Sequence, residues 1–287
     1  MKTSSTELPN LPLPDDIGNE EYPISAWIED AIASAPNRQR LQRQLDSIAS
    51  DQALLSFLHR FVLFNDALAA RVPYLAGLIH LTPNLFVDPS AGVDFCRQAN
   101  GRIAAFVAQA ASDEYEMSDG RNMVHQYLSQ RFFRGALAYF GADERSFDKL
   151  YPMPPGLNGL LAEARGKFFD QKGPAQIFCS LGFHVGLEFF AHQEFNLVDV
   201  YLRSKFPDFV AQLERDDRDR ASYLWLALHT VVEIGHYRAG LEALKAAVTY
   251  YWDRSGKSAM AGRIKEGFNA FVDLQGRYYE AILCDVR

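Results

Sequence analysis

The chain has 287 residues, a formal net charge of −7 and 48% hydrophobic residues. A chain of this length can bury a sizeable core as one large domain without help from disulfides. The acidic balance disfavours nucleic acid and anionic membranes as partners, because both are recognised through clustered basic charge. The three cysteines, Cys96, Cys179 and Cys284, are odd in number and widely spaced, which favours a reducing, cytoplasmic location.

The N-terminal stretch is polar and rich in proline, with Pro9, Pro12 and Pro14 among acidic residues. We expect residues 1–22 to form a flexible arm and residues 23–287 to form one helical domain. The arm lacks the apolar region of a signal peptide. No apolar run reaches the roughly 18 residues expected of a membrane-spanning helix.

Helical periodicity dominates the first third of the domain. Apolar residues recur at helical spacing from Ile24 onward. Ser50 and Asp51 can cap a helix that continues to a break at Pro73, and a short helix then runs to about Leu81.

The rest of the chain is also helical in pattern. We expect helices over residues 92–112, 123–140, 173–206 (limited by Pro207), 219–252 and 255–285 (capped near Ser255 or Ser258), with loops and short helices over 141–173. No convincing strand pair joined by an Asn-Gly or Asp-Gly turn is apparent. The pattern predicts an all-α bundle of about seven or more helices, in which inward-facing polar side chains can build a site.

The first candidate site is a helix that carries His229, Glu233 and His236 at positions i, i+4 and i+7. These side chains lie within about 60° of one another around the helix, and apolar neighbours indicate that this face is buried. Buried imidazoles and carboxylates are costly unless something satisfies them. Together they form a ligand set for iron, zinc, copper or manganese. The alternatives are a hydrogen-bonded polar network in the core and an exposed face.

The second candidate helix carries His184, Glu188 and His192. Glu188 lies in a run of leucine and phenylalanine, where a carboxylate is unusual, so we predict that it is a metal ligand. Glu194 is the alternative ligand from this helix. The two histidines are expected to be ordinary core or surface residues.

The third candidate segment holds Glu114, Glu116 and His125 around a predicted helix break. Apolar residues flank His125, so its side chain can face the interior. Either Glu114 or Glu116 could supply the first carboxylate ligand. The competing interpretation is that both are ordinary solvated acids.

Taken together, the three segments supply three carboxylates and three histidines. A single zinc ion would need only three or four ligands. Six ligands of this kind suit two iron ions that share bridging carboxylates, as in the ferritin-like proteins. The candidates contain only one Glu-x-x-His pair, Glu233 and His236, which argues against a ferritin.

These residues resemble the ligand pattern of the heme-oxygenase-like diiron oxidases, relatives of the TenA, PqqC and chlamydial CADD proteins. The pattern is a Glu, a His, a lone Glu and then His-x3-(Asp/Glu)-x2-His. The matching positions, within a resemblance that covers roughly residues 50–250, are Glu114, His125, Glu188, His229, Glu233 and His236. The acid at Glu233 departs from the commoner Asp, and the gap between Glu188 and His229 is longer than usual.

The resemblance implies a single-domain heme-oxygenase-like helical bundle with two Fe ions as cofactor and O2 as co-substrate. It implies an oxidase or oxygenase acting on a small amine- or amino-acid-derived substrate in natural-product biosynthesis. The expected reactions are N-oxygenation and oxidative C–C or C–N cleavage such as decarboxylation. Glu188 and Glu233 would be the catalytic carboxylates, and an external electron donor and a homodimer are compatible with this role. Arg134 or Arg238 could hold a substrate carboxylate, although a surface salt bridge is the simpler interpretation for each.

Three other functions remain open. The first is a metal-independent enzyme like TenA or PqqC. TenA chemistry would need a Cys and a Glu in one pocket, and Cys179 precedes Glu188 by nine residues and so faces another side of its helix. The second is a non-enzymatic, CADD-like protein that binds a partner. The third, heme oxygenase, would need a proximal histidine such as His59.

Overall fold

The computed structural model of the chain describes residues 24–88, 98–114, 117–118, 121–122, 124–166, 173–215 and 222–285. Within these ranges the chain forms an all-α bundle of twelve helices, which confirms the predicted fold class. The helices of the first half are α1 (Ile24–Ser34), α2 (Asn37–Asp46), α3 (Asp51–Ala69), α4 (Arg71–Leu81), α5 (Gln98–Glu114) and α6 (His125–Tyr139). Those of the second half are α7 (Glu144–Leu150), α8 (Pro155–Gly166), α9 (Pro174–Lys205), α10 (Pro207–Arg215), α11 (Leu224–Tyr250) and α12 (Lys257–Ala281).

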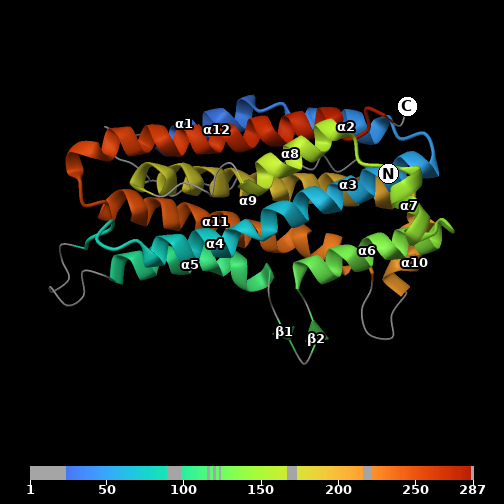
Figure 1. Cartoon of the computed structure of the whole chain (residues 1–287), viewed down its shortest axis with the longest axis horizontal. Coiled ribbons are helices and arrows are strands. Elements are labelled where there is room, and N and C mark those ends of the chain that lie inside the picture. Colours follow the sequence, from blue (N-terminus) through green and yellow to red (C-terminus); the bar gives the residue numbers. More distant parts are fainter. Residues whose placement is uncertain are drawn as a thin grey trace, which may run out of the picture.

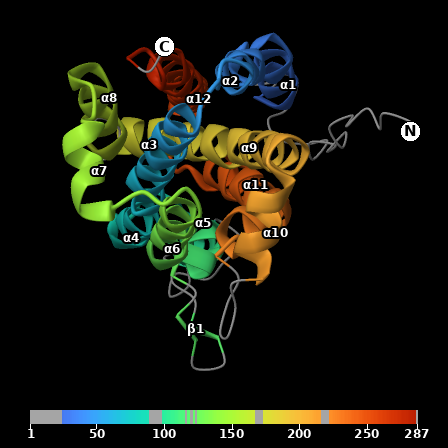
Figure 2. The same ribbon diagram turned by 90° about the vertical axis from the view of Figure 1, so that its right-hand side faces the viewer.

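The longest helix, α9, is the centre of the bundle. It packs against α12 on one side and α11 on the other, and this layering is visible in two perpendicular views (Figure 1 and Figure 2). Two glycines permit the close approach of α9 and α12. A Cβ atom on Gly182 would collide with the backbone carbonyl of Ile264, and one on Gly267 with that of Cys179. The central position of α9 explains why almost every side of it is buried.

The break between α3 and α4 falls three residues before the predicted position. Ser50 caps α3 as expected, its hydroxyl accepting a hydrogen bond from the backbone N–H of Ala53 at 3.2 Å. The helix then ends at Ala69, and Pro73 lies inside the first turn of α4, where no N–H is needed for an intrahelical bond.

The segment that contains α3 and α4 is long and apolar enough to cross a membrane by length and composition alone (Asp51–Leu81). The sequence analysis looked only for an uninterrupted apolar run, and this segment is interrupted by polar residues such as Arg60 and Asp66. Half of its most apolar window is buried inside the bundle, as is usual for a core helix, so the segment is weak evidence for a membrane span.

Two local features differ from the predictions. Strands β1 (Met117–Ser118) and β2 (Arg121–Asn122) form a minimal antiparallel hairpin that projects from the bundle between α5 and α6 (Figure 1). The residues between the strands are Asp-Gly, a pair favoured in two-residue hairpin loops, which the sequence analysis overlooked. At the start of α12, Asp253 caps the preceding 3₁₀ turn by accepting from the N–H groups of Ser255 and Gly256, so neither predicted serine is the cap.

The irregular stretch predicted for residues 141–173 contains the short helices α7 and α8, as expected. Helix α10 was not predicted from the sequence. The predicted arm, residues 1–22, lies outside the described residues. All twelve helices, α1 through α12, contribute residues to one hydrophobic core. The site described below lies within this core.

Candidate metal centre

Helices α9 and α11 bring four of the six predicted ligands into the core. Glu188 lies on α9, and His229, Glu233 and His236 lie on consecutive turns of α11. Their exposed fractions are 4%, 7%, 3% and 3%, so all four are buried. The prediction that these side chains share an inward face is confirmed.

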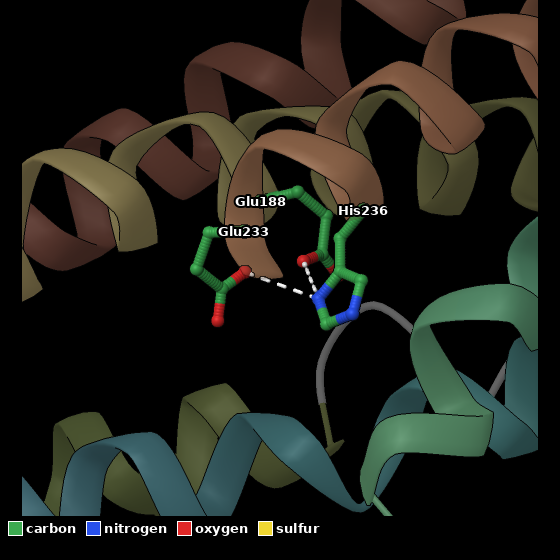
Figure 3. A group of neighbouring side chains, drawn as sticks. All are labelled: Glu188, Glu233 and His236. Carbon is green, nitrogen blue, oxygen red and sulfur yellow. Dashed lines mark hydrogen bonds and ion pairs between the residues drawn. The ribbon is translucent and has the colours of Figure 1, made fainter. Parts of the chain in front are cut away.

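Three of these side chains converge on one point. Single ligand-type atoms of Glu188, Glu233 and His236 all lie within 4.8 Å of one another (Figure 3). The Nδ1 atom of His236 is 3.4 Å from Glu188 Oε2 and 3.3 Å from Glu233 Oε2. Two carboxylates and one imidazole at this spacing form the ligand set that iron, zinc and manganese sites use.

Glu233 also faces the other half of the predicted site. Its Oε1 atom lies 3.8 Å from His229 Nε2, whereas its Oε2 atom faces His236. His229 Nε2 in turn lies 3.1 Å from Nδ1 of His125, at the start of α6. His125 is also buried, with 5% exposed. Glu233 therefore stands between two groups of ligand-type side chains.

Hydrogen bonds connect His125 and His229 to Trp225 in a closed cycle. The indole N–H of Trp225 donates to His125 Nε2 at 3.2 Å, because an indole nitrogen can only donate. His125 Nδ1–H must then donate to His229 Nε2 at 3.1 Å, and His229 Nδ1–H to the Trp225 carbonyl at 2.7 Å. In this cycle every ring nitrogen of the two imidazoles has a hydrogen-bond partner without a metal ion. This half of the site therefore matches the alternative of a hydrogen-bonded polar network in the core.

The structure adds Asp66 on α3, which the sequence analysis missed. Its Oδ1 atom lies 3.4 Å from His125 Nε2 and accepts a hydrogen bond of 2.7 Å from the Ser129 hydroxyl. Histidines that bind metal commonly donate their second ring N–H to such a carboxylate. The signal available in the sequence was the run Asn65-Asp66 on a helix that is otherwise strongly apolar.

The pKa values of the three convergent residues are strongly shifted by burial and by one another. Burial raises the pKa of Glu188, but the adjacent imidazoles of His184 and His236 outweigh it and hold that pKa below its usual range. Burial lowers the pKa of His236, yet Glu188 and Glu233 raise it to about 12. Burial, with the charge of Glu188, keeps the pKa of Glu233 well above its usual range although His236 opposes this. At neutral pH these shifts leave Glu188 ionised, His236 protonated and Glu233 neutral, and a divalent cation could replace the two protons.

His184 reaches the same carboxylate from one turn earlier on α9. Its Nδ1 atom is 3.1 Å from Glu188 Oε1, and its side chain is 2% exposed. Neither ring nitrogen has a hydrogen bond of good geometry within the described residues. His184 therefore lies nearer to the site than its predicted role as an ordinary residue implied. His192, one turn after Glu188, is half-buried and contacts Asn196, and it is not one of the three convergent residues.

Glu194, the alternative ligand of α9, has a different set of partners. Its Oε2 atom accepts a hydrogen bond of 2.8 Å from Gln275 on α12, and Asn65 on α3 also bonds to it. Burial raises the pKa of this carboxyl to about 8. Glu194 is not one of the three convergent residues, so the geometry favours Glu188 as the ligand from α9.

The first predicted carboxylate cannot be placed from the described atoms. Glu114 is the last residue of α5, and its side chain lies outside the description, as does all of Glu116. Helix α5 contacts α6, the helix that begins at His125.

The residues named for other roles lie as follows. Cys179 is buried between α9 and α12, where burial raises the pKa of its thiol to about 11, so it is a poor nucleophile. His59 stacks on Phe133 with ring centroids 4.8 Å apart. Arg238 is exposed on α11. Arg134 is exposed and pairs with Glu144 at 3.0 Å, which agrees with the salt-bridge interpretation.

A small cavity opens beside the ligands. It has a volume of about 20 Å³ and is lined by residues of both groups, among them His125, Glu188, His229 and Glu233. This is enough space for about one water molecule. The rest of its lining is Asn65 and apolar side chains such as Leu68, Leu187 and Phe195.

Comparison of the chain with protein-family models, curated proteins and solved structures gave no match. The likeness to the heme-oxygenase-like diiron oxidases therefore rests on the ligand residues and their order along the chain.

Proposed function

We propose that the protein is an O2-activating non-heme diiron oxidase or oxygenase. The observation that carries the proposal is the buried group of Glu188, Glu233 and His236, whose ligand-type atoms lie within 4.8 Å of one another. Two carboxyl groups and an imidazole this close together in a dry core must be satisfied by protons or by a metal ion, and one divalent cation can be bound by all three. These three residues would hold the first iron.

The second iron would be held by His125 and His229, with Glu233 as the shared ligand. The support is the orientation of Glu233, which turns one oxygen toward His236 and the other, at 3.8 Å, toward His229. A carboxylate oriented in this way can bridge two metal ions, as in the ferritin-like carboxylate proteins. Glu114 remains the candidate for the further carboxylate ligand.

When bound, two ferrous ions supply the electrons and the Lewis acidity that reduction of O2 requires. The chain contributes the surroundings of that chemistry. Phe195 stacks on the His229 ring with centroids 4.4 Å apart and limits the access of water. The Trp225 carbonyl accepts the Nδ1–H of His229, which leaves Nε2 of that imidazole to face the site.

The reaction and its setting are proposed from the resemblance. They are N-oxygenation or oxidative C–C or C–N cleavage, such as decarboxylation, of a small amine- or amino-acid-derived substrate in natural-product biosynthesis. The proposal includes a heme-oxygenase-like topology, a cytoplasmic location and an external electron donor. A metal-independent enzyme and a partner-binding protein are the alternatives that the following experiment addresses.

The test is anaerobic reconstitution of the full chain with Fe(II), followed by iron counting and exposure to O2. We expect two irons per chain, and one iron after either His229→Ala or His236→Ala. The matched control is His192→Ala, a half-buried histidine of α9 that is not among the predicted ligands, and this variant should retain both irons. Iron binding below one equivalent in the wild-type protein, or unchanged binding in both site variants, would contradict the proposal.

A further inference from the structure

The amide side chain of Asn65 on α3 lines the small cavity beside the candidate ligands. Asn65 is 5% exposed, and it shares the lining of the 20 Å³ cavity with His125, Glu188, His229 and Glu233. The remaining side chains of that lining are apolar. Among the described residues around this cavity, Asn65 is thus the one polar side chain that is not a predicted metal ligand.

The hydrogen bonds of the Asn65 amide use its nitrogen and leave its oxygen available. Nδ2 donates to the Phe61 carbonyl at 3.0 Å and to the carboxyl group of Glu194 on α9. An amide nitrogen carries two N–H groups, so these partners occupy both. The Oδ1 atom has no hydrogen bond with the part of the chain that the structure describes, and protein atoms do not seal it in as they seal Oδ1 of Asn37. The open space beside Asn65 is the small cavity, so Oδ1 is the atom that a molecule inside it can reach.

Glu194, which accepts from Asn65, is itself held by two further helices. Its Oε2 atom accepts from Nε2 of Gln275 on α12 at 2.8 Å, and Gln275 Oε1 accepts from Nδ2 of Asn37 on α2 at 2.8 Å. These three residues are 3%, 1% and 1% exposed. Hydrogen bonds in a dry core are strong and hold side chains rigidly. The chain from Asn37 to Asn65 therefore fixes the direction in which the Asn65 amide is turned.

The size and polarity of the cavity indicate what it holds. Its volume of about 20 Å³ is enough for about one water molecule. Empty cavities in proteins are apolar, whereas a buried water occupies a space that offers it two to four polar partners. A water molecule here can donate one hydrogen to Asn65 Oδ1 and the other to a carboxyl oxygen of Glu188 or Glu233, which line the same space.

We propose that Asn65 binds one water molecule in the cavity between the two groups of ligands, and that Glu194 is the positioning residue of Asn65. This gives a role to Glu194, which lies outside the convergent group. The binding of the water is independent of the proposed function. Its part in the reaction rests on that function: because the cavity has room for about one water, O2 can enter only when the water leaves.

The first test uses the metal-free full-length protein, so that it is independent of iron. Magnetic relaxation dispersion counts the water molecules that stay buried for long times. Asn65→Leu keeps the approximate size of the side chain and removes the acceptor, so it should hold one such water fewer than the wild type. The matched control is Ser56→Ala, which removes a buried hydroxyl of the same helix that does not line the cavity, and it should leave the count unchanged.

Variants of Glu194 test the positioning role by the same count. Glu194→Gln keeps an oxygen that can accept from Asn65, so it should retain the water. Glu194→Met removes that acceptor and lets the amide turn, so it should lose the water. Glu194→Leu is a second apolar replacement for the case in which Glu194→Met does not fold. Circular dichroism checks that each variant is folded.

The iron-loaded protein tests the part of the water in the reaction. Asn65→Leu should bind two irons, as the wild type does, because Asn65 is not a ligand. Oxidation of the irons by O2 should be about tenfold faster in this variant, because a hydrogen bond no longer holds the water that O2 must displace. Ser56→Ala should show the wild-type rate.

The proposal is overturned if Asn65→Leu holds as many buried waters as the wild type, or if a folded apolar variant of Glu194 retains the water. Loss of an iron in Asn65→Leu would overturn it in favour of Asn65 as a metal ligand. An unchanged rate with O2 in a variant that has lost the water would overturn its part in the reaction. Loss of the water in Asn65→Leu, in a protein that takes up no iron, would remove the proposed oxidase and retain this site.

Discussion

The Nε2 atom of His229 lies 3.1 Å from the Nδ1 atom of His125, although 104 residues separate the two in the chain. In the hydrogen-bonded cycle with Trp225, His125 donates its Nδ1 proton to His229. His125 can bind a metal through Nδ1 only if that proton leaves and Nε2 becomes the protonated nitrogen. Asp66 lies 3.4 Å from Nε2 and would accept this proton, whereas the indole N–H of Trp225 opposes it.

The first prediction concerns Asp66 and Trp225, which favour opposite protonation states of His125 Nε2. Asp66→Asn should weaken binding of the iron at His125 and His229 by about tenfold or more, because it removes the acceptor for the Nε2 proton. Trp225→Phe should not weaken binding of that iron, because it removes the indole N–H that competes for His125 Nε2. An anaerobic Fe(II) titration against a chromogenic chelator measures both, with Asp51→Asn at the exposed start of α3 as the control. Equal iron affinity in Asp66→Asn and the wild type would show that Asp66 does not orient His125.

The second prediction separates the two carboxylates of the centre. Glu233 faces His236 with one oxygen and His229 with the other, whereas Glu188 is near His184 and His236. Glu233→Gln should therefore lose both irons, and Glu188→Gln should lose one. O2-dependent turnover should be abolished in both.

Glu194→Gln is the control for that experiment because Glu194 lies outside the convergent group. It should retain both irons. Loss of iron in Glu194→Gln together with full retention in Glu188→Gln would exchange the roles of the two residues.

The third prediction concerns the effect of pH on stability through Glu194. Burial raises its pKa to about 8 in the folded protein, against about 4.5 when unfolded. The folded state therefore holds this proton more tightly, so the stabilisation is complete below about pH 4.5 and is lost as pH rises to 8. The loss is on the order of a few kcal/mol.

Glu194→Gln should remove this dependence because the amide stays neutral. Denaturant unfolding of the metal-free protein at pH 5 and pH 8.5 measures it. The variant should gain stability relative to the wild type at the higher pH, whereas the exposed Glu29→Gln should not. An unchanged difference between the two pH values would mean that Glu194 is ionised in the fold.

The all-α fold could be predicted because most helices carry their own signals. The cap at Ser50 and the long apolar runs of α9 and α11 depend on local sequence alone. The break before α4 was misplaced because proline is tolerated in a first helical turn, so Pro73 marks a helix start as readily as an end. The hairpin at Met117–Ser118 was missed because two-residue strands are too short for an alternating pattern.

The sequence predicts those site residues whose position follows from the pattern of a single helix. His229, Glu233 and His236 follow from helical spacing, and Glu188 follows from its apolar neighbours. Asp66 and the cycle through Trp225 depend on contacts between α3, α6 and α11, which no local pattern encodes. The same holds for His184, whose role depends on how α9 is rotated within the bundle.

The last prediction compares a helix glycine that faces open space, Gly235, with one that is packed against another helix, Gly267. Gly235 is exposed in the middle of α11, and a Cβ atom there would meet nothing within 4 Å. Gly235→Ala should stabilise the protein by up to about 1 kcal/mol, because alanine is the better helix former.

Gly267→Ala should do the opposite, because its Cβ would collide with the carbonyl of Cys179 where α12 crosses α9. It should destabilise the protein by about 1–3 kcal/mol through forced separation of the two helices. Equilibrium unfolding in denaturant measures both changes. If α11 must open for iron to enter, Gly235→Ala should also slow iron release to a chelator while iron stoichiometry stays the same. Faster iron release together with a stabilised fold would show that mobility of α11 does not control access to the centre.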